Sequence, residues 1–298
     1  MEILKISHLT KRFGDKEVLR GIDLNVQAGS IFGFIGQNGA GKTTTMKAVL
    51  GLLSPDEGEI TVCGEKVKFG ETPTNRFIGY LPDVPSFYSF LTAMEYLQLC
   101  GESIGMTQDD IAARSAELLE LVGLSQEKHR IKGYSRGMKQ RLGIAQALLG
   151  KPKLLICDEP TSALDPIGRK EILDILHSVK DQTTVLFSTH ILTDVERICT
   201  DVAFLHNGKI AMQGSVGELK KLHPSREFSV TPTDPQRILE ILRDLPDGKR
   251  MGEDRIIFSG NDQKLFQVLG YLAEQQIPVT EIQRIEPTLE RLFMEVVG

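Results

Sequence analysis

The sequence of 298 residues contains no tryptophan, only four cysteines and no long apolar run. The four cysteines lie far apart without a C-x-x-C pair, at Cys63, Cys100, Cys157 and Cys199. This spacing gives no support to a disulfide framework or a cysteine-ligated metal, and it favours four thiols in a reducing compartment. No stretch approaches the ~18 apolar residues that a membrane-spanning helix needs. Because the first residues also lack the apolar core of a signal peptide, we expect a cytoplasmic protein.

The chain also lacks an excess of basic residues. Lys and Arg number 35 and Asp and Glu 40, which gives a formal net charge of -5. Since binding to nucleic acid depends on basic patches that neutralise phosphates, we expect no nucleic acid partner. Hydrophobic residues make up 41% of the chain, which is enough for large cores. At ~150 residues per domain, the length suggests two domains.

The most informative motif is G-x-x-x-x-G-K-[ST], which matches residues 36–43. Backbone N–H groups of such a loop wrap nucleotide phosphates, and a helix beginning near Lys42 would add the positive end of its dipole. We expect Lys42 to reach the β- and γ-phosphates and the Thr43 hydroxyl to ligate Mg²⁺. The other residues that we expect to bind nucleotide here are Gly36, Gln37, Asn38, Gly39, Ala40, Gly41 and Thr44. The sequence therefore predicts binding of a nucleoside triphosphate.

A buried apolar strand is expected over residues 154–157, and two carboxylates follow it, Asp158 and Glu159. A carboxylate at the end of a buried strand is costly without a partner, and a bound cation is a natural one. We expect Asp158 to bind Mg²⁺, directly or through water, and Glu159 to polarise the attacking water as general base. The alternative is that both residues merely open a turn before Pro160.

Strands alternate with helices in the middle of the chain, which predicts a mainly parallel α/β sheet. Residues 3–34 have a β-rich pattern, whereas residues 90–150 become helical and include a capping box formed by Thr92 and Glu95. A second unit begins near residue 226, and its order of elements indicates a small α+β domain, ferredoxin-like in topology. Helices are predicted in it over residues 235–242, 263–274 and 287–297. We place the domains at residues 1–222 and 223–298.

Several separated motifs occur together in the order of one family. These are the phosphate loop, the strand that ends at Glu159, and residues 134–140, 162–165 and 188–190. On these motifs the chain resembles the ABC ATPases, the nucleotide-binding subunits of ABC transporters, over about residues 3–220. The resemblance implies a P-loop NTPase fold of ABC type, with a β-rich subdomain, a mainly parallel α/β core and a helical subdomain at about residues 88–150. It also implies ATP and Mg²⁺ as the cofactors.

The resemblance assigns roles to further residues. Phe13 would stack on adenine, and His190 would contact the γ-phosphate, acting in catalysis with Glu159 and Lys42. Ser135, Gly137 and Met138 fall in the signature motif, which would contact the γ-phosphate held by a second copy of the chain. Within that motif, Arg136 replaces a glycine of many members and Met138 a glutamine.

Asp83 stands where the family usually has a glutamine that senses the metal, water and the membrane partner. An aspartate could still hold a water on Mg²⁺, but it donates no hydrogen bond when ionised. We hypothesise that Asp83 keeps a coupling role. The apolar residues 84–91 follow directly, and two interpretations remain open for them: a core of the helical subdomain, or a groove that receives a helix of a permease.

Our main hypothesis is the ATP-binding and hydrolysing subunit of an ABC transporter. It would form an ATP-sandwich homodimer and drive a separate integral-membrane permease, lying peripherally on the inner face of the cell membrane. Residues 134–140, Asp83 and the ending over residues 285–293 resemble ATPases of exporters of drug-, peptide- or lipid-like substrates. The alternative is a soluble ABC-type ATPase in translation or DNA maintenance, although such proteins usually carry two ATPase halves or a coiled-coil insertion. A phosphate-loop kinase or GTPase would leave the signature residues and His190 unexplained.

Overall fold

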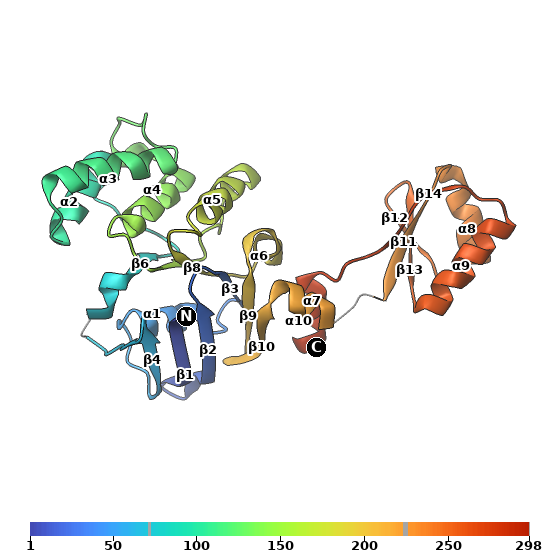
Figure 1. Ribbon diagram of the computed structural model, residues 1–298, viewed down its shortest axis with the longest axis horizontal. Coiled ribbons are helices and arrows are strands. Elements are labelled where there is room, and N and C mark those ends of the chain that lie inside the picture. The colour runs from blue at the N-terminus through green and yellow to red at the C-terminus, as the bar shows by residue number, and fades with distance from the viewer. Residues whose placement is uncertain (71–72, 223–225, 298) are drawn as a thin grey trace. The chain divides into compact units, whose positions relative to one another are not determined.

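The structure is a computed structural model that describes residues 1–70, 73–222 and 226–297 (Figure 1). Its chain divides into two compact units, residues 1–216 and 217–294, and the last residues are grouped with the first unit. The domain boundary predicted at 222/223 touches residues 223–225, which lie outside the described residues, so that boundary stays a prediction. Within the described ranges, no helix is long and apolar enough to cross a bilayer.

Two sheets organise the first unit. One is antiparallel with the strand order β2-β1-β4-β5. Its strands are β1 (Glu2–Phe13), β2 (Lys16–Gln27), β4 (Glu57–Val62) and β5 (Glu65–Lys66). The other has six strands in the order β10-β9-β3-β8-β7-β6, all parallel except the edge strand β10. Its strands are β3 (Ile31–Ile35), β6 (Ile78–Leu81), β7 (Leu154–Asp158), β8 (Thr184–Thr189), β9 (Asp201–His206) and β10 (Lys209–Ser215).

The central strands of the parallel sheet are buried along their whole length. Every residue of β3, β7 and β8 is buried, as expected for strands covered on both faces. The mainly parallel α/β core and the β-rich subdomain predicted from the sequence are therefore confirmed. One apolar core joins the two sheets to α1 (Lys42–Val49) through Phe34, Met46 and Ile6. This packing fixes both ends of the loop over residues 36–41.

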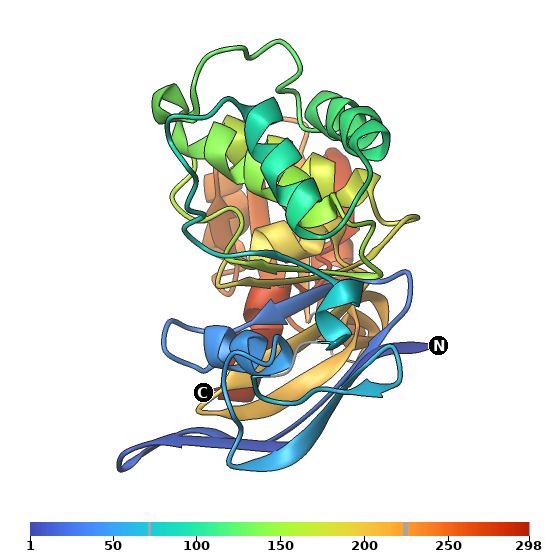
Figure 2. The same cartoon turned by 90° about the vertical axis from the view of Figure 1, so that its left-hand side faces the viewer.

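The helices of the first unit fall into two groups. Helices α5 (Pro166–Ser178) and α6 (Leu192–Ile198) connect strands of the parallel sheet, and α1 leads from β3 of that sheet to β4 of the antiparallel sheet. Helices α2 (Ala93–Ser103), α3 (Gln108–Leu121) and α4 (Arg136–Leu148) gather on the side of that sheet opposite the antiparallel strands (Figure 2). The predicted capping box of α2 is present: Thr92 Oγ1 accepts from the Glu95 N–H, and the Glu95 carboxylate accepts from the Thr92 N–H at 2.8 Å. The helical subdomain is thus confirmed. The short segments are 3₁₀ turns at Pro73–Phe77 and Ile131–Gly133 and helix α7 (Val216–Leu222).

The second unit is an antiparallel sheet with the order β12-β13-β11-β14, covered on one face by two helices (Figure 1). Its elements are β11 (Glu227–Pro232), α8 (Ile238–Asp244), β12 (Lys249–Met251), β13 (Arg255–Ser259), α9 (Asp262–Glu274) and β14 (Val279–Arg284). This β-α-β-β-α-β order is the ferredoxin-like arrangement, and the predicted small α+β domain is confirmed. Phe228 and Phe258 stack in its core with ring centroids 5.6 Å apart.

Two predicted helices of this region begin later than expected. Residues Pro235–Arg237 form a 3₁₀ turn, and the α-helix starts only at Ile238. Asp234 is the N-cap of this 3₁₀ turn, as predicted for the helix, and its side chain accepts from the N–H of Gln236, two residues on. The last helix, α10 (Leu289–Val297), was predicted from residue 287.

Candidate active site

The loop between β3 and α1 leaves the helix N-terminus open to a ligand. Gly39 and Gly41 have φ angles of 83° and 116°, which residues with a Cβ rarely adopt. No heavy atom lies within 4 Å of where a Cβ of Gly39 would stand. Gly41 is the N-cap of α1 and supplies no side-chain acceptor to the first N–H groups of that helix. Since these groups need an acceptor, the loop suits a phosphate, and its residues fit the predicted nucleotide.

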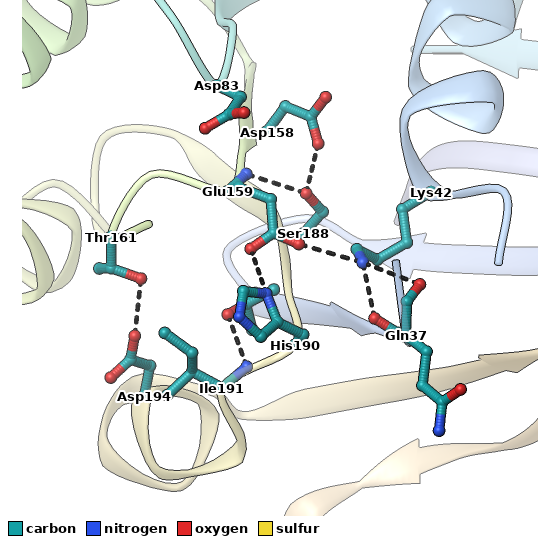
Figure 3. Close-up of polar contacts among 12 residues, drawn as sticks. Gln37, Lys42, Asp83, Asp158, Glu159, Thr161, Ser188, His190, Ile191 and Asp194 are labelled. Carbon is teal, nitrogen blue, oxygen red and sulfur yellow. Dashed lines mark hydrogen bonds and ion pairs between the residues drawn. The ribbon is translucent and has the colours of Figure 1, made fainter. Parts of the chain in front are cut away.

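The three side chains predicted to act in catalysis are in contact (Figure 3). Lys42 Nζ donates to the backbone carbonyl oxygens of Gly36 at 2.6 Å and Gln37 at 3.4 Å. It also lies 3.0 Å from Glu159 Oε1, in an ionic contact that lacks hydrogen-bond geometry. Glu159 Oε2 lies 2.9 Å from Nδ1 of His190. The charge of the buried Lys42 is therefore balanced by Glu159, the residue predicted to act as the general base.

Two of the three residues predicted to bind metal, Thr43 and Asp158, are in direct contact, whereas Asp83 is not bonded to either. Thr43 Oγ1 donates to Asp158 Oδ2 at 2.7 Å, and Asp158 is only 2% exposed. Among the described residues, no group of three or more His, Cys, Asp or Glu could hold a metal ion. Mg²⁺ typically uses one or two protein ligands together with substrate phosphates and waters. A pair such as Thr43 and Asp158 at the phosphate loop fits that requirement.

The Ser188 hydroxyl links the carboxylate of Asp158 to the backbone of Glu159, and no role was predicted for Ser188 beyond its place in the motif at residues 188–190. Its hydroxyl donates to Asp158 Oδ1 at 2.6 Å and accepts from the backbone N–H of Glu159 at 3.0 Å (Figure 3). The turn interpretation of Asp158 and Glu159 is therefore incomplete, because both residues are held toward the phosphate loop. The sequence signals for this residue were its place in the motif at residues 188–190 and its polar side chain near the end of the apolar strand β8.

A pocket of about 530 Å³ opens over these residues. Predicted site residues that line it are Phe13, Asn38, Gly39, Gly41, Lys42, Thr43, Thr44, Asp83, Glu159 and His190. Lys16, Val18 and Ser162 also line it and were not predicted. Of the other predicted residues, Gly36 and Gln37 turn their carbonyls to Lys42, and Ala40 and Asp158 do not line the pocket. The Phe13 ring is half exposed at the pocket edge, where a flat base could cover it.

Asp83 reaches the pocket from the segment after β6. Its Oδ1 atom is buried without a hydrogen-bond donor, and the nearest cation is the Arg136 guanidinium at 3.6 Å. Burial raises the pKa of the Asp83 carboxyl above its usual range, and the charges of Asp158 and Glu159 add to this, whereas Arg136 opposes it. A carboxylate in this position would gain from a nearby cation or a hydrogen-bonding water.

The signature residues lie outside the pocket. Ser135 is the N-cap of α4, and its hydroxyl accepts from the backbone N–H of Met138 at 3.2 Å. Gly137 lies in the same first turn, and a Cβ there would have no contact closer than 3.9 Å. None of the three residues lines the pocket that contains Lys42. One chain therefore does not bring them to its own phosphate loop.

Known proteins share this fold and these motifs. The family model described as ABC transporter matches residues 19–162. The chain is 38% identical over 305 residues to the uncharacterised ABC transporter ATP-binding protein YxlF of Bacillus subtilis (strain 168), with 99% of both chains covered. The chain belongs to the ABC transporter family. It is an ATP-binding subunit of that family, and membership implies ATP hydrolysis.

Other relatives support the same assignment. The bacitracin transport ATP-binding protein BcrA of Bacillus licheniformis is 38% identical, covering 99% of this chain and 97% of its own. A solved structure of the ATP-binding subunit of an ABC transporter aligns with a TM-score of 0.66 at 32% identity, covering 74% of this chain and 92% of its own. A dimeric ATP-binding cassette in a post-hydrolysis state, bound to ADP and phosphate, aligns with a TM-score of 0.64 at 25% identity, covering 72% and 98%.

Proposed function

We propose that two copies of this ABC subunit close around two ATP molecules and drive a separate integral-membrane permease of an exporter. The observation that carries the proposal is the separation within one chain between the pocket and the signature residues Ser135 and Gly137. A γ-phosphate at Lys42 would need a second chain to supply those contacts. The dimeric state of the similar ADP- and phosphate-bound cassette supports this arrangement.

Within the pocket, each side chain has a role that its contacts support. The Lys42 ammonium would bind the β- and γ-phosphates, and Thr43 and Asp158 would hold Mg²⁺, which neutralises charge on the phosphate oxygens. Glu159 would accept the proton of the attacking water, while His190, at 2.9 Å, orients that carboxylate. Phe13 would stack on the adenine ring.

Exposed aromatic side chains support a membrane partner. Val84, Tyr88 and Phe90 are 67%, 57% and 62% exposed, so the interpretation of residues 84–91 as subdomain core is wrong for these three. Tyr88, Phe90 and Leu99 line a hollow of about 340 Å³ in the helical subdomain. We propose that a cytoplasmic helix of the permease docks there. The chain would then lie peripherally on the inner face of the membrane.

The class of exported substrate rests on relatives. BcrA is named for bacitracin transport, and this favours drug- or peptide-like substrates, with lipid-like ones as a related possibility. The alternative, a soluble ABC-type ATPase in translation or DNA maintenance, has no corresponding support among the relatives described above.

Reconstitution tests the proposal. The chain is co-expressed and purified with a candidate multi-span permease, and ATPase activity is measured in liposomes with and without candidate peptides. We expect stimulation by the permease, and a Tyr88→Cys chain should crosslink to it. Ile104→Cys is a matched control, because Ile104 is 57% exposed in the same subdomain but lines a different hollow. A complex that neither assembles nor stimulates ATPase activity would favour the soluble alternative.

A further inference from the structure

Besides the contact between Glu159 and His190, a second contact, which is buried, lies between Thr161 and Asp194. Thr161 Oγ1 donates to Asp194 Oδ2 at 2.7 Å (Figure 3). Thr161 is fully buried and Asp194 is 3% exposed, and neither side chain lines the nucleotide pocket. Thr161 belongs to the segment that follows Glu159, and Asp194 belongs to α6, which follows His190. The hydrogen bond therefore ties together the two segments that carry the paired side chains.

The segment that carries Glu159 has a backbone that needs support. Glu159 and Ala163 have φ angles of 48° and 52°, in the left-handed region that residues with a Cβ rarely occupy. Such strained residues persist only where their surroundings hold them in place. The backbone N–H of Glu159 is held by Ser188, and the Thr161 side chain is held by Asp194. Both supports come from β8 and the helix after it.

Asp194 has a simpler possible role in its own helix. It lies in the first turn of α6, where a carboxylate interacts favourably with the helix dipole, and the N-cap residue Ile191 supplies no side-chain cap. That role does not require Thr161, which lies outside the helix. Burial raises the pKa of the Asp194 carboxyl, and the Thr161 hydrogen bond and the charges of Arg169, Arg197 and His190 oppose this. Burying a carboxylate costs free energy, and this cost favours a function for the specific hydrogen bond between Asp194 and Thr161.

We propose that Thr161 and Asp194 are positioning residues for ATP hydrolysis. Their hydrogen bond holds the strained segment after Glu159 against α6, and so keeps the Glu159 carboxylate on the His190 ring. The inference rests on the proposed roles of Glu159 and His190 in hydrolysis and is independent of the permease.

Matched substitutions separate positioning from folding. Thr161→Val removes the hydroxyl at nearly constant volume, whereas Thr161→Ser keeps it. Asp194→Asn keeps an acceptor oxygen for Thr161, whereas Asp194→Leu does not. We expect Thr161→Val and Asp194→Leu to lower kcat on the order of ten- to hundred-fold, as small misplacements of catalytic groups do. KM for ATP should change less than about threefold because neither residue touches the pocket, and Ser and Asn should restore kcat.

A measurement without nucleotide tests the geometry directly. The chain has six histidines, so the His190 imidazole signals in NMR spectra are assigned by their loss in His190→Ala. In Thr161→Val these signals should move toward their positions in Glu159→Ala, and in Thr161→Ser they should not. If Thr161→Val fails to fold, the double variant Thr161→Val/Asp194→Asn removes the unpaired buried charge and should show the same two effects.

The positioning role and the proposed function are refuted by different results. Unmoved His190 signals in Thr161→Val overturn the positioning role, and so does a lowered Tm with unchanged kcat. A wild-type chain that binds ATP without hydrolysing it overturns the proposed function, while the His190 signals still decide whether the contact positions the pair.

Discussion

Replacing Glu159 by Gln should both slow hydrolysis and tighten ATP binding. The Glu159 carboxylate lies 3.0 Å from the Lys42 ammonium, and the two side chains are 12% and 6% exposed. At an effective dielectric constant of ~20, two unit charges at this distance attract by about 5 kcal/mol before desolvation is subtracted. Hydrogen bonds to charged groups typically retain about 1.5–3 kcal/mol after that subtraction, which is an upper bound for this ionic contact. Lys42 must give up this contact to bind phosphate, so Glu159→Gln should lower the Kd for ATP, by about a hundred-fold at most.

The same substitution removes the proposed general base, which typically contributes ~10²–10⁴-fold to the rate. Equilibrium titration with a fluorescent ATP analogue measures the affinity, and phosphate release measures the rate. Glu171→Gln is the control, because it changes the net charge equally from a half-exposed position on α5, 3.8 Å from Arg141. If both variants bind ATP equally tightly, Glu159 does not compete for Lys42. Turnover within tenfold of the unaltered chain would refute its role as base.

Three further predictions follow from single contacts. Gly41→Ala would place a Cβ 2.6 Å from Leu19 Cδ2 at a φ of 116°, so this variant should lose ATP binding and have a lower Tm. In Gly39→Ala the new Cβ meets no atom, and only the cost of the φ of 83° remains, so its Tm should fall less. Equal losses of Tm in the two variants would contradict the steric argument. His190→Ala should slow ATP hydrolysis, measured as phosphate release, about hundredfold. The Kd for ATP should change by less than about threefold, because His190 contacts Glu159 rather than Lys42. A loss of affinity as large as the loss of rate would show instead that His190 acts in ATP binding. The Thr92 backbone N–H and hydroxyl lower the pKa of the Glu95 carboxyl, so its stabilising effect is present above the ordinary value of 4.5 and is lost as the pH falls through the lowered value. Glu95→Gln should therefore lower Tm at neutral pH, with a difference that shrinks in acid, and a constant difference would exclude this charge as the cause.

The elements that could be predicted are those marked by a pattern within a short stretch of sequence. Residues 36–43 combine a contiguous motif with a buried strand before it and a helix after it, so the loop and Lys42 could be predicted together. The capping box at Thr92 is equally local. Strand β12 was missed because its three residues are all exposed and two of them are basic. Strand β10 was missed although Ile210 and Met212 alternate with exposed residues, as is typical of a half-buried strand. The order β10-β9-β3-β8-β7-β6 was also beyond reach, since packing between distant segments decides which strands become neighbours.

The same limit applies to the site. Asp158 and Glu159 were identified by their place after an apolar strand, but Ser188, which holds both, is 30 residues from Asp158 in the chain. Thr161 and Asp194 are 33 residues apart, and each alone is an ordinary turn or helix residue. Such partners have no fixed spacing, because the lengths of α5 and of the loops around it separate them. Only the folded sheet brings the ends of β7 and β8 side by side.

The contacts of Glu159 link the occupancy of the pocket to its chemistry. In this structure Glu159 Oε1 lies 3.0 Å from Lys42 Nζ and Oε2 lies 2.9 Å from His190 Nδ1, so each oxygen lies next to a protein group. A general base needs an oxygen that can accept from water. A phosphate that takes over the Lys42 ammonium would release Oε1, which accepts no hydrogen bond in this structure, while His190 still holds Oε2 in place. On this geometry we expect Glu159, if it is the base, to lose the competition of Lys42 for Oε1 when phosphate binds, and so to accept more readily from water.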